Sequence, residues 1–113
     1  MNRRGEPAES LAVAFLEREG LKILERNYRC KMGEIDLIAK SGDTTIFVEV
    51  RARSSEAFGG AAESITSAKR ARLIRAARHY LSRQRGDPAC RFDVVLVRGA
   101  EQRVEWLPGA FGA

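Results

Sequence analysis

The spacing of apolar and polar residues along the chain predicts an alternation of helices and strands. Residues 6–20 have helical spacing and stop at Gly20, and a second helix is predicted from Ser64 or Thr66 to about Arg83. Strand patterns cover residues 21–30, 33–40, 44–52, 91–97 and 103–107, with a loop rich in glycine, serine and alanine at 54–63. The order αβββαβ, followed by a short last strand, predicts an α/β fold in which helices flank a mixed central sheet.

The length and the composition of the chain indicate an ordinary soluble domain. With 113 residues, of which 44% are hydrophobic and 31% charged, we expect one domain over residues 1–113. No apolar run reaches the length of a membrane span, and the N-terminus has no apolar signal region, so we expect a cytoplasmic protein that does not enter a membrane. The net charge of +5 favours a polyanionic partner such as nucleic acid, although charge alone does not establish one.

The cysteines and the histidine do not form a pattern that binds zinc. Cys30 and Cys90 are far apart in the sequence, and His79 is its only histidine. A zinc site or a Cys–His catalytic pair is therefore not expected, and the sequence favours buried free thiols in a reducing compartment.

The segment GEIDLIAKSGDTTIFVEVRARS, residues 33–54, predicts a hairpin with two acids in its strands. Gly42 at the first central position of a two-residue turn suits type II′ geometry. That register places Ile35 opposite Val50, Leu37 opposite Val48 and Ala39 opposite Ile46, on one apolar face. The other face pairs Asp36 with Glu49, and directly opposed Cβ atoms lie roughly 4.5–5.5 Å apart. Because two carboxylates this close repel each other, a positive group is expected between them.

Two kinds of positive group fit this position. A divalent ion such as Mg²⁺ is commonly held by one or two carboxylates together with water and substrate phosphate. Alternatively, Arg51 and a neighbouring lysine neutralise the acids as a structural ion network. The spacing of the acids leaves both alternatives open.

Two further residues bear on the same site. In the second predicted helix, Lys69 falls in the middle of an apolar stripe formed by Ile65, Leu73, Ala76 and Tyr80. A lysine on the buried side of a helix needs a partner, unless its side chain extends to water. Glu9 lies at the edge of the apolar face of the first helix. It is interpreted either as a third metal ligand or as a solvated surface residue.

These residues together resemble a known family. The segments GEPAE, RNYRCKMGEIDLIA, FVEVRAR, SAKRARL with its lysine, and CRFDVV closely resemble the bacterial YraN-like family of small uncharacterised proteins. That family is similar to archaeal Holliday-junction resolvases within the PD-(D/E)xK, or restriction-endonuclease-like, nuclease superfamily. The resemblance extends from Gly5 to Phe111 and implies the αβββαβ core of that superfamily.

The resemblance implies roles for the acids and for the cations beside them. Asp36 and Glu49 match the motif acids, and Glu9 is similar to the glutamate that resolvase-type members contribute, so all three are implied ligands of Mg²⁺ (or Mn²⁺), with low occupancy expected without substrate. Arg51 stands where the motif has a catalytic lysine, and Lys69 is the candidate that replaces it. Arg91 and Asp93 also recur in the family pattern, with no expected role beyond a strand-to-helix ion pair.

The function that the resemblance implies is metal-dependent hydrolysis of phosphodiester bonds in DNA, including branched or damaged forms. The main alternative is a nucleic-acid-binding module of the same fold with weak or no catalysis, because arginine at position 51 keeps its charge but does not give up a proton. A third alternative is a subunit whose sheet edge or basic helix docks a protein, in which the acids are relics of a nuclease site. DNA is favoured over RNA, and a homodimer is compatible with the symmetry of a junction. Basic side chains that could track the backbone, or could instead form a solvated face, are Arg53, Arg70, Arg72, Arg75 and Arg78.

Overall fold

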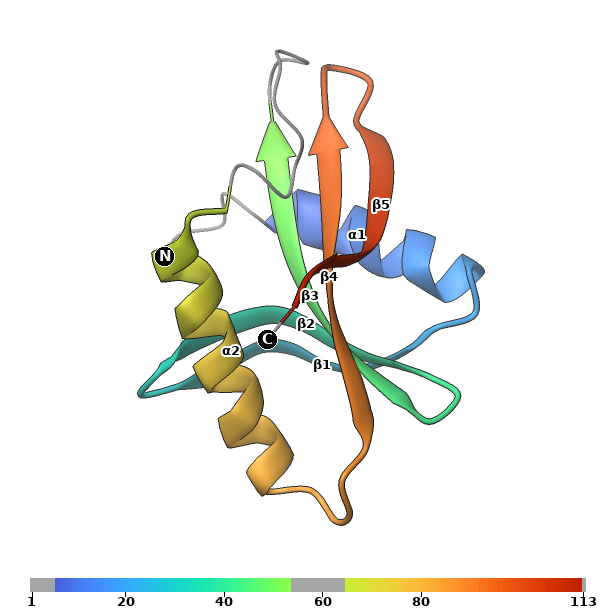
Figure 1. The fold of residues 1–113 in the computed structure, drawn as a ribbon. Helices are drawn as coiled ribbons and strands as arrows, with labels where there is room; N and C mark the ends of the chain where they lie inside the picture. The colour runs from blue at the N-terminus through green and yellow to red at the C-terminus, as the bar shows by residue number, and fades with distance from the viewer. Residues whose placement is uncertain (1–5, 54–64, 113) are drawn as a thin grey trace.

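A computed structural model of the chain describes residues 6–53 and 65–112. This part of the chain forms a five-stranded sheet in the order β1-β2-β3-β4-β5, with a helix on each side (Figure 1). The elements are α1 (Glu6–Arg18), β1 (Lys22–Cys30), β2 (Gly33–Ser41), β3 (Thr44–Arg53), α2 (Ser67–Ser82), β4 (Ala89–Arg98) and β5 (Arg103–Phe111). The predicted α/β class with a restriction-endonuclease-like αβββαβ order is confirmed, and β5 extends it.

The sheet is mixed, as the sequence predicts. The strands β1, β2 and β3 pair antiparallel, β3 and β4 pair parallel across the connection that contains α2, and β4 and β5 pair antiparallel. The last strand is longer than the predicted 103–107. Its register with β4 shifts between Phe92 and Val94, and this bulge carries β5 past Pro108 to Phe111.

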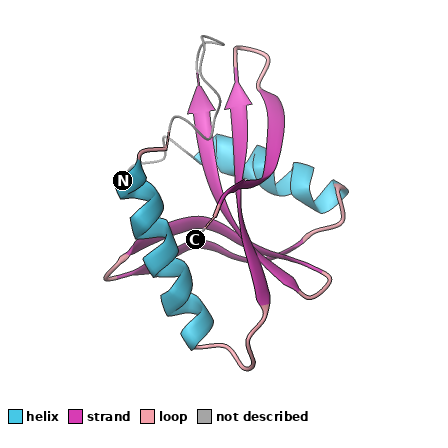
Figure 2. Cartoon of the chain, in the orientation of Figure 1, coloured by secondary structure: helices cyan, strands magenta, loops and turns pink. Residues whose placement is uncertain are grey.

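The two helices of the described residues cover opposite faces of the sheet (Figure 2). On the α1 face, Ala12 and Leu16 pack against strand residues that include Leu37, Val48 and Val95. On the α2 face, Leu73, Ala76, Ala77 and Tyr80 pack against Tyr28, Ile35, Ile38, Phe47 and Phe92. The sheet is therefore buried on both sides, which explains the continuous apolar runs in its central strands.

The helix ends follow the signals in the sequence. After α1, Gly20 has φ of 96°, and the Leu21 N–H bonds to the Leu16 carbonyl at 3.0 Å, as in a Schellman motif. Before α2, Thr66 is the N-cap, and its hydroxyl accepts a hydrogen bond from the Lys69 N–H at 3.1 Å. Of the two predicted caps, Ser64 lies outside the described residues. The placement of Ile65 within the helix is wrong, because the extended Thr66 puts Ile65 before the first turn.

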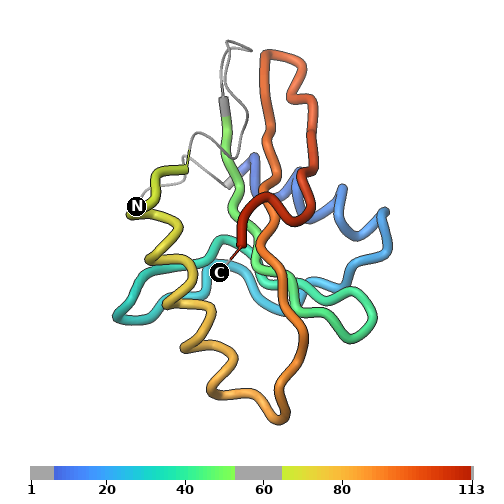
Figure 3. Tube along the Cα trace, in the orientation of Figure 1, coloured from blue at the N-terminus to red at the C-terminus, as the bar shows by residue number. Residues whose placement is uncertain are grey.

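The hairpin register is confirmed from the turn as far as Leu37 and Val48, and Gly42 has the positive φ, 58°, that the turn requires. Farther from the turn than the pair of Leu37 and Val48, β2 separates from β3, while β3 continues beside β4 (Figure 3). The predicted common face for Ile35 and Leu37 is therefore wrong. Ile35 packs on the α2 face, whereas Leu37 packs on the α1 face, because the strand no longer follows the regular ladder.

The cysteines correct another expectation from the sequence. Both are free thiols, but Cys90 is exposed and Cys30 is partly exposed. Cys90 is exposed because it lies near the start of β4, before the buried stretch of that strand begins at Phe92. Within the described ranges, no helix is both long and apolar enough to cross a membrane.

Arg91 and Asp93 form a structural network inside the sheet rather than an ion pair with a helix. Asp93 is 0% exposed, and Arg91 on the same strand donates to both of its carboxylate oxygens, at 2.8 and 3.0 Å. The indole N–H of Trp106 and the backbone N–H of Gly109 also donate to it, each at 2.9 Å. The carboxylate thus holds the bulged part of β5 against β4.

We predict that Asp93→Asn lowers the free energy of unfolding by about 3 kcal/mol, because it leaves Arg91 without its partner in a buried network. The control is Glu105→Gln, which removes a carboxylate from the more exposed pair with Arg98 and is expected to change stability by less than about 1 kcal/mol. Urea unfolding followed by circular dichroism measures both. Equal losses in the two variants would contradict the structural role of Asp93.

Candidate functional site

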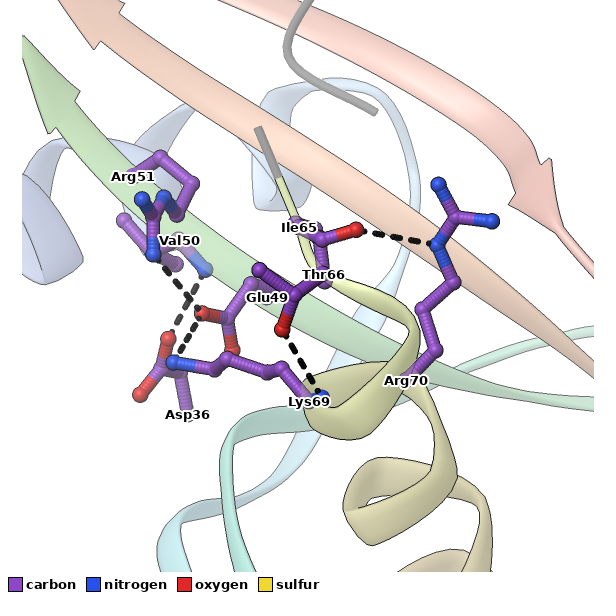
Figure 4. A network of polar contacts seen from close by, with 8 residues as sticks. All are labelled: Asp36, Glu49, Val50, Arg51, Ile65, Thr66, Lys69 and Arg70. Carbon is purple, nitrogen blue, oxygen red and sulfur yellow. Dashed lines mark hydrogen bonds and ion pairs between the residues drawn. The ribbon is translucent and has the colours of Figure 1, made fainter. Parts of the chain in front are cut away.

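Asp36 lies where β2 leaves β3, a place that we call the fork and define by Asp36 and Val50. The Val50 N–H donates to Asp36 Oδ2 at 2.8 Å (Figure 4). In a ladder continued in the same register, this N–H would bond to the Ile35 carbonyl. The Asp36 carboxylate therefore takes the place of the Ile35 carbonyl as the acceptor for the Val50 N–H. Glu49 precedes Val50 on β3.

The predicted pair of acids meets at an open cleft between the sheet and α2. The cleft has a volume of about 250 Å³ and is lined by Gly33, Glu34, Asp36, Glu49, Lys69, Arg72 and Leu73. Asp36 and Glu49 come from adjacent strands, and Lys69 and Arg72 come from the first two turns of α2. Sequence positions far apart therefore converge on one small and mostly polar space.

Glu49 is neutralised by two cations. Its side chain is 5% exposed, and its Oε2 lies 2.8 Å from Lys69 Nζ and 3.8 Å from Arg51 NH1 (Figure 4). Lys69 reaches it from the helix that Thr66 caps, and Arg51 lies two residues along the same strand. Of the two alternatives for Lys69, the structure shows the paired one. The same contacts form the ion network that the sequence offers as the alternative to a metal ion.

Asp36 has fewer compensating partners, and its electrostatics reflect this. The pKa of the Asp36 carboxyl is raised from 3.8 to about 7, chiefly by burial and next by the negative charge of Glu49. The charge of Glu9 contributes to the same rise, whereas the hydrogen bond from the Val50 N–H opposes it. A cation at the fork would relieve this repulsion between the acids.

Glu9 lies on α1, which covers the opposite face of the sheet from α2. Its side chain is mostly buried, and its Oε1 accepts a hydrogen bond from Asn27 Nδ2 at 3.2 Å. Arg26 NH2 lies 3.9 Å from the same oxygen. Among the described residues, no three histidine, cysteine, aspartate or glutamate side chains gather closely enough to hold a metal ion. The assignment of Glu9, Asp36 and Glu49 as ligands stays a prediction.

Three of the five arginines that could track a nucleic-acid backbone, Arg53, Arg70 and Arg72, have different surroundings. Arg72 lines the cleft. Arg70 lies over the ring of Phe111 at 5.8 Å and donates to the Ile65 carbonyl at 3.1 Å, so it also joins the start of α2 to β5. Arg53 ends β3, and its side chain lies outside the described residues. Their contact with nucleic acid stays a prediction.

Sequence reasoning missed Asn27 as a neighbour of the site. It lies in β1 with φ of 56°, and its amide contacts Glu9. From the sequence it looks like an exposed strand position, and its contact with α1 joins residues 18 positions apart. The one available signal was the residue type, since asparagine adopts the left-handed region more readily than other residues with a side chain.

Comparison with known proteins shows the family. The model of the uncharacterised protein family UPF0102 matches residues 8–97. The chain belongs to the UPF0102 family. This confirms the family predicted from its motifs, and the matched region contains all three acids of the site together with Arg51 and Lys69.

The UPF0102 relatives are similar over nearly the whole chain. A UPF0102 protein of Nitrosomonas europaea is 58% identical over 109 residues, which cover 96% of this chain and 92% of the relative. One of Cupriavidus taiwanensis is 55% identical over 111 residues, covering 97% and 83% of the two chains. One of Methylobacillus flagellatus is 49% identical over 114 residues and covers all of both chains.

The raised pKa of Asp36 predicts how the stability of this UPF0102 protein depends on pH. In the pH range from about 4 to 7, the folded state holds a proton on Asp36 that the unfolded state releases. This contribution to stability is therefore complete below about pH 4 and is lost as the pH rises through about 7. Relative to Asp36→Asn, which does not titrate, the wild type should lose up to about 4 kcal/mol across this range.

Urea unfolding of both proteins at pH 4, 5, 6, 7 and 8 measures this difference. Asp87→Asn, at an exposed aspartate outside the site, is the matched control and should follow the wild type at every pH. A constant difference between wild type and Asp36→Asn would show that Asp36 titrates normally.

Proposed function

We propose that this UPF0102 protein binds nucleic acid and is a metal-dependent endonuclease that hydrolyses phosphodiester bonds in DNA, including branched or damaged forms. One observation supports the proposal above the others. Asp36 and Glu49 line the same open cleft, and Lys69 lies 2.8 Å from Glu49 at that cleft. Two acids with an adjacent lysine form a chemical set suited to phosphodiester hydrolysis.

The residues present fit a hard divalent cation. Mg²⁺ often takes only one or two carboxylates from a protein and fills its other positions with water and substrate phosphate. Asp36 and Glu49 would hold Mg²⁺ or Mn²⁺, with Glu9 as the third acid. When bound, the ion would acidify a water molecule and polarise the scissile phosphate.

The cations of the chain would act on the phosphate. Lys69 places an ammonium group at the cleft, where it would offset negative charge that builds up on the phosphate. Arg51 would add charge and could grip a phosphate oxygen, but it keeps its proton near neutral pH. Arg72 would contact a neighbouring phosphate from the next turn of α2.

The aromatic side chains favour duplex or branched DNA over a stacked single strand. Tyr28, Phe47 and Tyr80 are each at most 5% exposed, so they are not available as stacking platforms for bases. This supports recognition through the backbone, with affinity that falls as salt rises. The preference for DNA over RNA, a homodimer and a cytoplasmic location stay predictions.

The binding module without catalysis is the second candidate, and Arg51 is the residue that favours it. Its position matches the motif lysine, and it lies 3.8 Å from Glu49 without offering a proton. In this alternative, Lys69 and Arg51 serve only to neutralise Glu49.

The first test titrates Mn²⁺ into the wild type and Asp36→Asn by calorimetry, with Asp87→Asn as the matched control. We expect Asp36→Asn to weaken Mn²⁺ binding by at least about tenfold, because it removes a charged ligand. We also expect it to abolish cutting of linear and four-way-junction DNA, whereas Asp87→Asn behaves as the wild type. Equal Mn²⁺ binding by all three proteins would refute the ligand assignment.

The second test separates the enzyme from the binding module by Arg51→Lys. If Lys69 supplies the catalytic cation, this change should alter the rate of DNA cleavage little, because the charge beside Glu49 is kept. The rates are compared on the same linear and four-way-junction substrates at saturating Mn²⁺. A wild type that binds Mn²⁺ and DNA but does not cut, together with a variant that does, would establish the binding module.

A further inference from the structure

Asn27 has an unusual backbone for a strand residue. Its φ is 56°, and the pairing of β1 with β2 includes Arg26 and Tyr28 on either side but not Asn27 itself. Glycine adopts this left-handed region without strain, whereas a residue with a side chain pays a conformational cost there. Strained backbone of this kind gathers at functional sites. Asparagine tolerates this region better than other residues with a side chain, so the role of Asn27 has to be judged from the contacts of its amide.

The amide of Asn27 links β1 to α1 through Glu9. Asn27 Nδ2 donates to Glu9 Oε1 at 3.2 Å, and Glu9 is 9% exposed. The left-handed turn accompanies a gap in the ladder directly across from Asp36, since the flanking pairs are Arg26 with Leu37 and Tyr28 with Ile35. Glu9 is thus held from the same place in the sheet where Asp36 leaves the ladder.

We propose that Asn27 is a positioning residue that holds the Glu9 carboxylate toward Asp36, so that a third acid faces the cation site. This inference rests on the proposed function. Residues that orient a metal ligand by hydrogen bonding typically change metal affinity by about 10–100-fold when they are replaced.

The test is a double-mutant cycle on Mn²⁺ affinity, measured by calorimetry for the wild type, Asn27→Gly, Glu9→Gln and the double variant. Glycine keeps the left-handed backbone and removes the amide. We expect Asn27→Gly to weaken Mn²⁺ binding about 10–100-fold. In the Glu9→Gln background, the same change should have no further effect.

Gln102→Gly is the matched control. Gln102 is the other described residue with a side chain and positive φ, 55°, and it lies in the turn between β4 and β5. We expect this change to leave Mn²⁺ affinity unchanged, which separates relief of backbone strain from loss of the Asn27 amide.

The outcomes distinguish this inference from the proposed function. If Asn27→Gly binds Mn²⁺ as tightly as the wild type, the inference is overturned and the proposed function stands. If Asn27→Gly causes the same loss with and without Glu9, Asn27 does not act through Glu9 and the inference is again overturned. If the wild type itself binds no Mn²⁺, both are overturned together.

Discussion

The fold brings two carboxylates together at a place where solvent is restricted. Hydrogen-bond donors and cations from the surrounding elements reduce the repulsion between them. Asp36 and Glu49 occupy adjacent strands at the fork. The Val50 N–H satisfies one oxygen of Asp36, and Lys69 and Arg51 approach the same oxygen of Glu49. The lysine arrives there because Thr66 starts α2 directly beside the cleft. The compensation is uneven, since Glu49 has two cationic partners while Asp36 keeps a raised pKa.

A second buried carboxylate in the same sheet shows why burial alone does not mark a functional acid. Asp93 is fully enclosed, yet it receives four N–H donors from Arg91, Trp106 and Gly109. These donors satisfy its charge from within the fold, so it needs no ligand and its role is structural. Asp36 receives one backbone donor, and its pKa is raised by burial and by the charges of Glu49 and Glu9. The difference lies in the partners of each acid and could not be read from residue type.

The sequence predicted what local patterns determine and missed what long-range contacts determine. The turn at Gly42 set the hairpin register, and Thr66 and Gly20 marked helix ends, because turns and caps depend on neighbouring residues. The separation of β2 from β3 at Asp36 was not predicted, because the alternation of apolar and polar residues gives no signal for where two strands stop pairing. The role of Asp93 depends on a bulge in β5, and that of Asn27 on contact with α1, and neither leaves a periodic signal. The metal-ligand roles predicted for the acids came from family resemblance, because local patterns left a metal ion and an ion network as open alternatives.

Arg51, which stands where the resemblance implies a lysine, shares its acid with Lys69. Two cations reach one oxygen of Glu49, one from β3 and one from α2, and the nearer is the lysine. The ammonium group beside Glu49 therefore comes from the helix and not from the strand. Arginine there retains the positive charge that the buried glutamate requires and adds a planar group able to hold a phosphate.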